Sequence, residues 1–345
     1  MENIKLFNTV NQIGYNIKPY IIAEMNTSHF GNIETAKEMI KSAKKCGCDC
    51  VKFQSWSADS LYSKTYYDEN PIAKRIFNKF AFDENQLKDL AAYCNKLGID
   101  FSSTPYSEKE VDFLINECNA AFIKVASMEL NNYPFLEYIG KTNAPIILST
   151  GMGDLSEIKK AVQTIEKTGN KKICILHCIS IYPCETSTIN LNNIVGLKRE
   201  FPQYHIGYSD HSVGTEIPSA AIALGACVIE KHFTLDKSKI GMDNQMASEP
   251  NEMETLVKNC SNVQIALGSE TRVVNSEEIE QRKNMRRSII FKNSLKSGDT
   301  VTIDDLYVKR PGTGYPPEKI NEFVGKVVAR DVEADTLIKK EDIKI

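Results

Sequence analysis

The chain has 345 residues, of which 42% are hydrophobic and 25% are charged, and its formal net charge is −3 at pH 7. This composition is typical of a globular protein with one large domain and one small one, and the weak negative charge argues against nucleic acid or an anionic membrane surface as a partner. No apolar run approaches the roughly 20 residues that span a bilayer, and the N-terminus lacks a secretory signal pattern, so we expect a cytoplasmic protein.

Eight short apolar segments have the length and composition of β-strands, and most are separated by one helix-length segment. In chain order they are YIIAE (20–24), CVKFQ (50–54), IDFSST (99–104), AFIKVAS (121–127), PIILST (145–150), ICILH (173–177), HIGYSDH (205–211) and CVIEKH (227–232). Eight strand–helix units predict an α/β fold, a TIM (β/α)8 barrel over residues 1–268. Nearly every segment ends in a residue able to do chemistry, where barrel enzymes place their active sites, so we predict an enzyme.

The segment 32–46 illustrates the predicted helices, because its apolar residues recur at helical spacing and Gly47 can end it in a left-handed conformation. Residues 55–82 break the strand–helix alternation with a long aromatic and polar insertion. It follows the second strand and therefore lies on the catalytic face, so we predict a lid or a substrate wall. A surface excursion without a role is the alternative.

The pattern changes after the last strand–helix unit. Residues 269–287 are highly charged and lack strand alternation, which predicts a linker with some helix. Residues 288–345 read as short strands and turns, and the pieces 295–306 and 332–343 resemble each other. We predict a small second domain there, near the lower size limit for independent folding.

The ten cysteines are scattered and form no C-x-x-C pair. Three alternate in Cys46-Gly-Cys48-Asp-Cys50, where side chains on an extended segment would splay awkwardly around a tetrahedral ion. We therefore predict structural, reduced thiols.

Two of the five histidines, His211 and His232, end consecutive predicted strands, so their imidazoles can converge above the barrel. A pair of imidazoles that leaves other positions open suits a catalytic divalent ion that also binds water and substrate oxygens, and manganese, cobalt, zinc and iron all accept such ligands. His205 begins its strand and is predicted to be structural, whereas His177 ends a strand and is expected to line the pocket.

Lys52 and Lys124 lie in the second and fourth strands, where a buried lysine is costly unless it meets an anion. Strand-end hydroxyls would complete a ring suited to phosphate and carboxylate, namely Ser103, Thr104, Ser127, Ser149 and Ser209. Alternatively, one lysine points outward between helices. Glu24 and Glu129 add carboxylates that can orient a hydroxyl or transfer a proton.

A dense, ordered set of motifs makes the chain similar to a known family over essentially its full length. The motifs are IIAEMNTSHFG, GCDCVKFQ, FSSTPYS, IKVASMELNNYP, PIILSTGM, LHCISIYP, IGYSDHSVG, ALGACVIEKHFTLDK and VKRPGTG. They resemble the bacterial sialic acid synthases, which make N-acetylneuraminic, legionaminic and pseudaminic acids. The resemblance implies a phosphoenolpyruvate-condensing barrel followed by an antifreeze-like SAF domain, assembled as a domain-swapped homodimer.

The resemblance also implies residue roles. His211 and His232 would hold the divalent metal, for which we expect Mn²⁺, with Co²⁺ or Mg²⁺ as alternatives, and Glu24 would sit beside the reacting centre. Phosphoenolpyruvate would be bound by Lys52, Thr104, Lys124, Ser127, Ser149 and Ser209. The sugar would face Gln54, Glu129, Tyr182 and Asp243, and Arg310 would reach its N-acyl group from the tail domain of the partner.

The reaction implied is condensation of phosphoenolpyruvate with an unphosphorylated N-acyl hexosamine, giving a nine-carbon 2-keto acid and phosphate. The sugar is left open between N-acetylmannosamine and a 2,4-diacetamido-trideoxyhexose, because departures from the family pattern cluster in sugar-facing loops, at 28–31, 177–180 and 241–243. The alternatives are a 3-deoxy-sugar-acid phosphate synthase acting on a phosphorylated aldose, a class that lacks a SAF tail, and a degenerate sugar-binding barrel.

Overall fold

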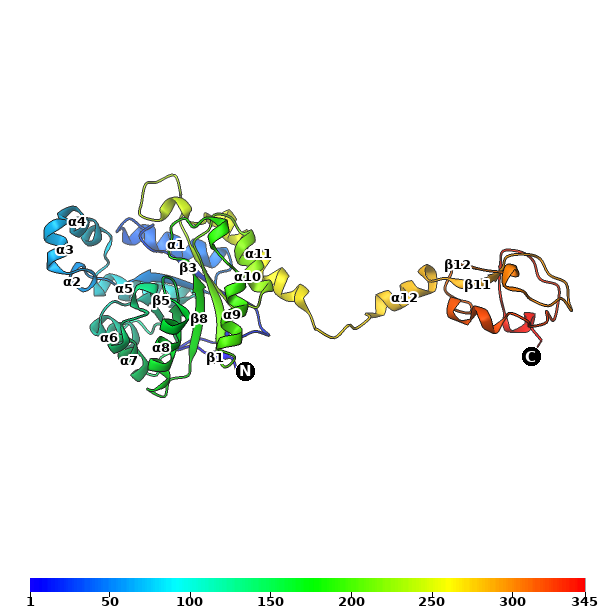
Figure 1. The fold of residues 1–345 in the computed structure, drawn as a ribbon. Helices are drawn as coiled ribbons and strands as arrows, with labels where there is room; N and C mark the ends of the chain where they lie inside the picture. Colours follow the sequence, from blue (N-terminus) through cyan, green and yellow to red (C-terminus); the bar gives the residue numbers. More distant parts are fainter. Residues whose placement is uncertain (345) are drawn as a thin grey trace. The chain divides into compact units, whose positions relative to one another are not determined.

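The computed structural model describes residues 1–344 and divides the chain into two compact units, Met1–Gly268 and Ser269–Ile345 (Figure 1). Each unit is described by itself. Among the described residues, no helix combines the length and apolarity that crossing a bilayer requires.

The first unit is a closed barrel of eight parallel strands, in the order β10-β3-β4-β5-β6-β7-β8-β9. The strands are β3 Tyr20–Glu24, β4 Cys50–Gln54, β5 Asp100–Thr104, β6 Ile123–Val125, β7 Ile146–Ser149, β8 Ile173–Cys178, β9 His205–Asp210 and β10 Val228–His232. Each overlaps one of the apolar segments found in the sequence. The predicted (β/α)8 barrel is therefore confirmed.

Helices follow the strands and cover the outside of the barrel (Figure 1). They are α1 Ile33–Lys45, α5 Glu84–Leu97, α6 Glu108–Asn116, α7 Tyr133–Lys141, α8 Leu155–Glu166, α9 Asn192–Glu200, α10 Glu216–Ala223 and α11 Pro250–Leu267. Helix α1 begins where the Asn32 side chain accepts a hydrogen bond from the backbone N–H of Thr35, and Gly47 follows its end with φ 87°.

The insertion folds into three short helices, α2 Ala58–Leu61, α3 Lys64–Glu69 and α4 Pro71–Phe80. Single-turn 3₁₀ helices follow β6, β8 and β10, at η1 Ser127–Glu129, η2 Thr186–Thr188 and η3 Asn244–Met246. These segments lie at the C-terminal ends of the strands, which is the end that carries the candidate site.

The opposite end of the barrel is filled by apolar side chains. An N-terminal hairpin, β1 Ile4–Lys5 and β2 Gln12–Ile13, contributes Ile4 and Ile13 to a cluster with the interior residues Ile22 and Phe122. A second, larger cluster packs the strands against the helices. All ten cysteines are free and buried, in agreement with the predicted reduced thiols.

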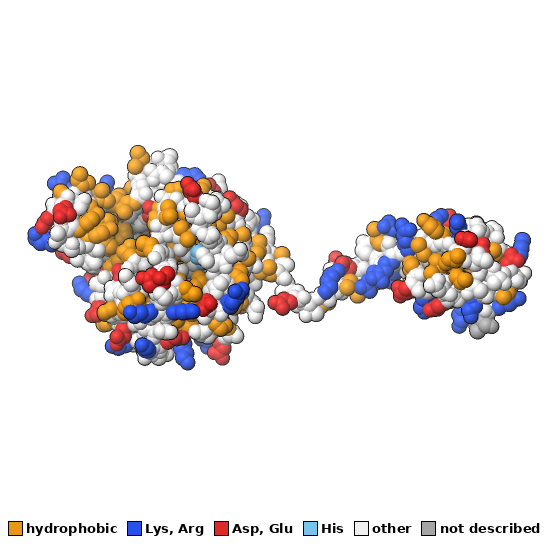
Figure 2. Space-filling model, viewed as in Figure 1, with side chains coloured by type: hydrophobic (Ala, Val, Ile, Leu, Met, Phe, Trp, Pro, Cys, Tyr) orange, Lys and Arg blue, Asp and Glu red, His pale blue; other side chains and the backbone are white. Residues whose placement is uncertain are grey.

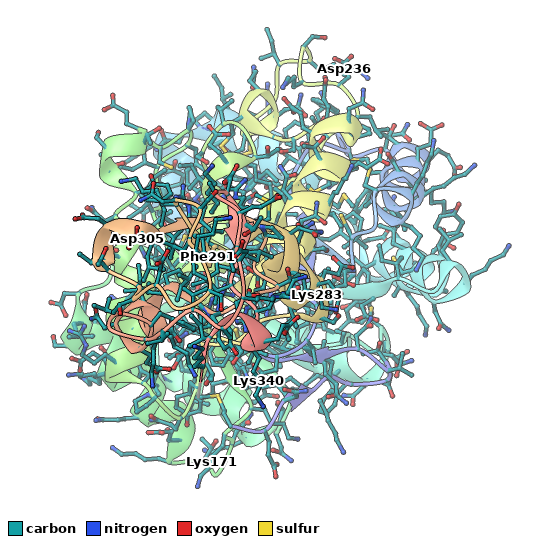
Figure 3. The ribbon with its side chains drawn as sticks, turned by 90° about the vertical axis from the view of Figure 1, so that its right-hand side faces the viewer. Lys171, Asp236, Lys283, Phe291, Asp305 and Lys340 are labelled. Carbon is teal, nitrogen blue, oxygen red and sulfur yellow. The ribbon has the colours of Figure 1, made fainter. Side chains whose placement is uncertain are left out.

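The second unit contains helix α12 Ser276–Met285 and a three-stranded antiparallel sheet in the order β12-β11-β13. The strands are β11 Ser288–Phe291, β12 Leu306–Lys309 and β13 Thr336–Leu337, and the 3₁₀ helices are η4 Ile303–Asp305, η5 Pro317–Glu322 and η6 Lys340–Asp342. Its small apolar core includes Phe291, Val328 and Ile338. Phe291 lies near the centre of this unit, whereas Asp305 and Lys340 lie toward its periphery (Figure 3).

Candidate active site

A cavity of about 400 Å³ opens at the C-terminal ends of the barrel strands. Of the fourteen residues to which the family resemblance gives roles, all but two line it, namely Glu24, Lys52, Gln54, Thr104, Lys124, Ser127, Ser149, Tyr182, Ser209, His211, His232 and Asp243. Eight strands thus bring together side chains that are up to about 220 residues apart in sequence, as a closed parallel barrel requires.

The two remaining residues lie elsewhere. Glu129 is in η1, where its Oε2 accepts a hydrogen bond from Asn132 Nδ2 at 2.7 Å, and it is not among the residues that line the cavity. Arg310 follows β12 in the second unit and is exposed there.

Strand register sets one layer of the cavity floor. In the barrel sheet His232 pairs with Glu24, and Glu24 pairs with Lys52, so the three lie side by side. Glu24 and Lys52 are both buried and form an ion pair. Burial and the nearby carboxylate of Glu230 raise the pKa of Glu24 despite this pairing. Burial alone would lower the pKa of Lys52, but the carboxylates of Glu24 and Glu230 raise it, so this amine stays charged.

Both lysine side chains point into the cavity rather than outward between helices. Lys52 Nζ donates to Thr104 Oγ1 at 2.9 Å, and Lys124 Nζ donates to Ser149 Oγ at 2.7 Å. Burial and the charge of Lys52 lower the pKa of Lys124, although Glu230 opposes the shift. An anion bound here would offset the repulsion between the two cations.

Glu230 was absent from the predicted site, yet it lies at the centre of the floor. Its Oε1 accepts a hydrogen bond from Ser209 Oγ at 2.9 Å and lies 3.7 Å from Lys124 Nζ. Burial opposes its ionisation, but Lys124 and Lys52 outweigh that effect and lower the pKa of Glu230. The signal was available in the sequence, because Glu230 precedes His232 by two residues on one strand and therefore faces the same side.

The two imidazoles predicted to hold a metal lie together. Their ring centroids are 5.4 Å apart, and His211 Nδ1 donates to the Ile179 carbonyl at 2.7 Å, which leaves its Nε2 free. Burial and the charges of His211 and nearby lysines lower the pKa of His232 well below its usual value, so this ring is neutral, the form that binds a metal. Burial also disfavours protonation of His211, but the Cys178 thiol and the Ile179 carbonyl raise its pKa overall.

The donor set fits a divalent ion held by few protein ligands. His232 Nδ1 is buried without a hydrogen-bond partner, and no group of three or more His, Cys, Asp or Glu gathers as a metal cluster within residues 1–344. An ion bound by His211 and His232 would therefore complete its coordination with water and substrate oxygens, the arrangement expected of a catalytic site.

Three predicted placements at the strand ends need correction or detail. His177 does not line this cavity, because its Nε2 contacts the Ile189 carbonyl at 2.7 Å and the side chain borders a neighbouring cavity. Ser103 faces away from the site and hydrogen bonds Ser55, since adjacent strand residues point to opposite sides and Thr104 takes the inward position. His205 is buried at the start of β9, stacked 4.9 Å from Tyr15, as its predicted structural role requires.

The insertion forms one wall of the cavity, which favours the substrate wall over the surface excursion. Trp56, Leu61, Tyr62 and Phe77 all line the cavity. Figure 2 shows hydrophobic side chains gathered over α3 and α4 on this side of the barrel unit.

Two hydrogen bonds connect Tyr106, Gln54 and Glu24, which all line the cavity. Tyr106 Oη donates to Gln54 Oε1 at 2.7 Å, and Gln54 Nε2 in turn donates to Glu24 Oε1 at 2.8 Å. A separate hydrogen bond joins two other lining residues, in which Asn26 Nδ2 donates to Asp243 Oδ2 at 2.6 Å. Tyr106 and Asn26 were not predicted, because each follows its strand in a loop where no periodicity fixes the side-chain direction.

Comparison with known proteins identifies the family. Residues 39–272 match the NeuB family model, and residues 286–344 match the SAF domain. The chain is 35% identical to the N,N'-diacetyllegionaminic acid synthase of Legionella pneumophila, covering 100% of both chains. It is 36% identical to the mouse N-acetylneuraminate-9-phosphate synthase, covering 94% of this chain and 92% of that one.

A solved structure is also similar. The N-acetylneuraminic acid synthetase of Leptospira borgpetersenii superposes with a TM-score of 0.74 at 32% identity, covering 82% of this chain and 97% of that one. The chain therefore belongs to the NeuB family, carries a C-terminal SAF domain, and is an enzyme of the sialic, legionaminic and pseudaminic acid synthase type.

Proposed function

We propose that this member of the NeuB family condenses phosphoenolpyruvate with an unphosphorylated N-acyl hexosamine, giving a nine-carbon 2-keto acid and phosphate. The observation that carries the proposal is the floor of the cavity, where two buried lysines and several hydroxyls lie beside paired imidazoles. Phosphoenolpyruvate presents a phosphate and a carboxylate, which need such donors, and a sugar aldehyde needs an electrophilic site beside them.

The hydroxyls are positioned for the phosphate and carboxylate of phosphoenolpyruvate. Thr104 and Ser149 already contact the amines of Lys52 and Lys124, so each amine is held in one place before substrate arrives. Ser127 and Ser209 line the same region of the cavity. Preorganised donors of this kind bind an anion without a reorganisation cost at the moment of reaction.

The reaction balances without an organic cofactor. The methylene carbon of phosphoenolpyruvate forms a bond to the aldehyde carbon of the open-chain sugar, and the aldehyde oxygen takes up a proton. Water adds to the cationic centre left at C2 and loses a proton, and the C2–O bond to phosphate then breaks as the C2 hydroxyl passes its proton to the departing phosphate and becomes the keto group. We assign Glu24, whose pKa is raised by burial, to hold or accept a proton beside that centre. A divalent ion bound by His211 and His232, Mn²⁺ in this proposal, would supply Lewis acidity at the aldehyde.

The charge of the cavity supports an unphosphorylated sugar. The barrel residues that line it include two lysines, Lys52 and Lys124, and no arginine. Both lysines are at the floor, where phosphoenolpyruvate takes them up. Gln54, Tyr182 and Asp243 remain for the hydroxyls and the acyl group of the sugar.

We also propose that the working enzyme is a homodimer in which Arg310 of one copy acts at the barrel of the other. Support comes from the exposed position of Arg310 within its own unit and from the sequence resemblance described above. Co-expression of Arg310→Ala and His232→Ala chains tests it. If the arginine acts in trans, each heterodimer retains one intact site of two, so the co-expressed mixture recovers up to about a quarter of wild-type activity under random pairing. No recovery in verified heterodimers would refute the exchange.

A substrate panel tests the main proposal. Phosphate release is measured with phosphoenolpyruvate and Mn²⁺ against N-acylated hexosamines on one side and arabinose or erythrose phosphate on the other. We expect release only with an N-acyl hexosamine. Release with the phosphorylated aldoses alone would favour the 3-deoxy-sugar-acid phosphate synthase, and no release with any sugar would favour a binding protein.

A further inference from the structure

A second cavity, of about 360 Å³, lies beside the catalytic one and takes part in no step of the proposed reaction. The loop after β7 and helix α8 line one side of it, and helix α9 lines the other. Its volume is within the range of small-molecule sites. Met152 and Leu155 line it and stay 71% and 42% exposed, so a ligand there would bury apolar surface that is now open to solvent.

Helix α9 carries a glycine on the face that lines this cavity. Asn193, Gly196 and Glu200 recur at helical spacing and all line it. A Cβ at Gly196 would meet no side chain and no other segment of the chain within 4 Å, so packing does not require a glycine here. A glycine inside a helix is destabilising relative to alanine. Gly196 therefore keeps space open in the cavity at the expense of helix stability.

Two polar side chains indicate what the cavity can bind. His177 Nε2 donates to the Ile189 carbonyl at 2.7 Å, and burial lowers the pKa of this ring, so Nδ1 is an acceptor. That nitrogen has no hydrogen-bond partner within residues 1–344. At the rim, Glu200 pairs with Lys159 at 2.6 Å, whereas the exposed Arg199 forms no ion pair among the described residues. The cavity therefore offers a ligand one acceptor and one unpaired cation.

Two residues connect the second cavity to the catalytic one. Cys178 lines both cavities, and its Sγ lies 4.0 Å from His211 Nδ1. Ile179 lines the second cavity, and its carbonyl accepts the hydrogen bond from His211 Nδ1 at 2.7 Å. A group that accepts a hydrogen bond from one nitrogen of an imidazole fixes the orientation of the ring. A ligand packed against Ile179 would therefore contact the residue that orients His211.

We propose that the second cavity binds a small apolar carboxylate that also carries an N–H or O–H donor, and that its occupancy is transmitted to His211 through Ile179. The apolar body of the ligand fills the space beside Gly196, its donor reaches His177 Nδ1, and its carboxylate pairs with Arg199. Neither binding nor transmission depends on the condensation reaction, so both are measured in the enzyme without its substrates.

Histidine resonances report on this site directly, because the chain has five histidines. The probe is indole-3-acetate, titrated into the full chain labelled with ¹⁵N at histidine. We expect saturable shifts at His177, which the ligand contacts, and at His211, whose hydrogen-bond acceptor belongs to Ile179. His29 and His205 should stay unchanged, since neither lines this cavity. A Kd of about 0.05 to 1 mM is expected for a ligand of this size.

Variants locate the binding. Gly196→Leu fills the cavity and should abolish the saturable shift, whereas Gly196→Ala leaves most of the space and should still bind. Arg199→Gln should raise the Kd for indole-3-acetate about 3- to 10-fold, between the effects of exposed and buried charged hydrogen bonds, and should leave the Kd for uncharged indole-3-acetamide unchanged. Lys167→Gln is the matched control, because it removes one charge from an exposed position that does not line the cavity.

Several results would overturn the proposal. One is the absence of a saturable shift at His177. Another is binding that persists in Gly196→Leu while the variant remains folded by thermal melting, which would place the ligand elsewhere, for example on the lysines of the catalytic cavity. If Gly196→Leu does not fold, equal Kd values for Arg199→Gln and the wild type decide against the site. A shift at His177 without one at His211 would refute the transmission.

Discussion

The floor and the wall of one cavity are built on different principles. The floor is made of strand ends, where ion pairs and hydrogen bonds hold Lys52, Lys124 and Glu230 in a buried polar network. The wall is made of one long insertion, whose residues Trp56 and Tyr62 contact the cavity through rings. The difference supports the proposal that the barrel supplies the reaction chemistry, whereas the insertion contributes to the choice of sugar.

The largest effect is expected at the floor. His232→Ala should lower kcat by roughly 100-fold or more, because Lewis acidity contributes several kcal/mol to the transition state. Chelation should abolish turnover of the wild type, and Mn²⁺ or Co²⁺ should restore it. His205→Gln is the control, since that histidine is buried at the opposite end of the barrel. Full activity of a chelated His211→Ala, His232→Ala double variant would show that the reaction needs no metal at these histidines.

A smaller effect should separate the two substrates. Lys124→Ala removes a cation from the proposed phosphoenolpyruvate site, so the KM for phosphoenolpyruvate should rise roughly 10- to 100-fold, the range for a lost hydrogen bond to a charged group. The KM for the sugar should change little. Arg should rescue poorly, because its planar fork does not fit the position of an ammonium. An unchanged KM for phosphoenolpyruvate would show that the floor does not bind it.

The residue that joins floor and wall should give an intermediate phenotype. Tyr106→Phe removes the hydroxyl that donates to Gln54. The ring centroids of Tyr106 and Trp56 are 6.2 Å apart. Loss of one neutral hydrogen bond should raise the KM for the sugar by about 2- to 10-fold, with the KM for phosphoenolpyruvate unchanged. Equal changes in both constants would mean that floor and wall are not separable at this point.

The last effect concerns stability rather than catalysis, and it is expected at His29, which packs where the insertion rejoins the barrel. His29 stacks on Phe82 at a centroid distance of 4.2 Å, and burial lowers its pKa to about 4. The unfolded chain binds this proton near pH 6.5, so between pH 6.5 and 4 the unfolded state is favoured as the pH falls. The barrel should lose about 2 kcal/mol from this group by pH 5.

The matching variant is His29→Asn, which keeps an acceptor near the Nδ1 position that now accepts from the Gly31 N–H. Chemical denaturation at several pH values should show a shallower loss of stability in the variant, by up to one proton in slope. Equal slopes for the variant and the wild type would mean that His29 is not the group responsible.

The sequence predicted the floor better than the wall for a physical reason. Side chains alternate along a strand, and the C-terminal ends of parallel barrel strands meet at one point, so Lys52 and His232 could be placed together. The same alternation should have excluded Ser103 and included Glu230. The alternation of side chains does not extend to residues just beyond a strand. Glu129 is an example, because it lies in a 3₁₀ turn and its carboxylate accepts a hydrogen bond from Asn132.

The fold was predictable because hydrophobic periodicity and length specify strand and helix units. The insertion was recognised because it interrupts the alternation of strands and helices. Its three helices, however, depend on aromatic packing, such as that of Tyr62 and Phe77, whose ring centroids are 5.3 Å apart. Contacts of this kind arise from tertiary packing and have no local signature. The prediction that His177 lines the cavity was wrong for the same reason, because the Ile189 carbonyl that His177 contacts comes from a separate loop.

The central claim is that the floor condenses phosphoenolpyruvate with a sugar rather than merely hydrolysing it. The most direct measurement is the reaction in water enriched in ¹⁸O, with the sugar acid and the phosphate analysed by mass spectrometry. We expect one nine-carbon acid for each phosphate, and phosphate free of ¹⁸O, because the C–O bond breaks and water adds to carbon. Phosphate that carries ¹⁸O from the solvent, or phosphate released without the acid, would contradict it.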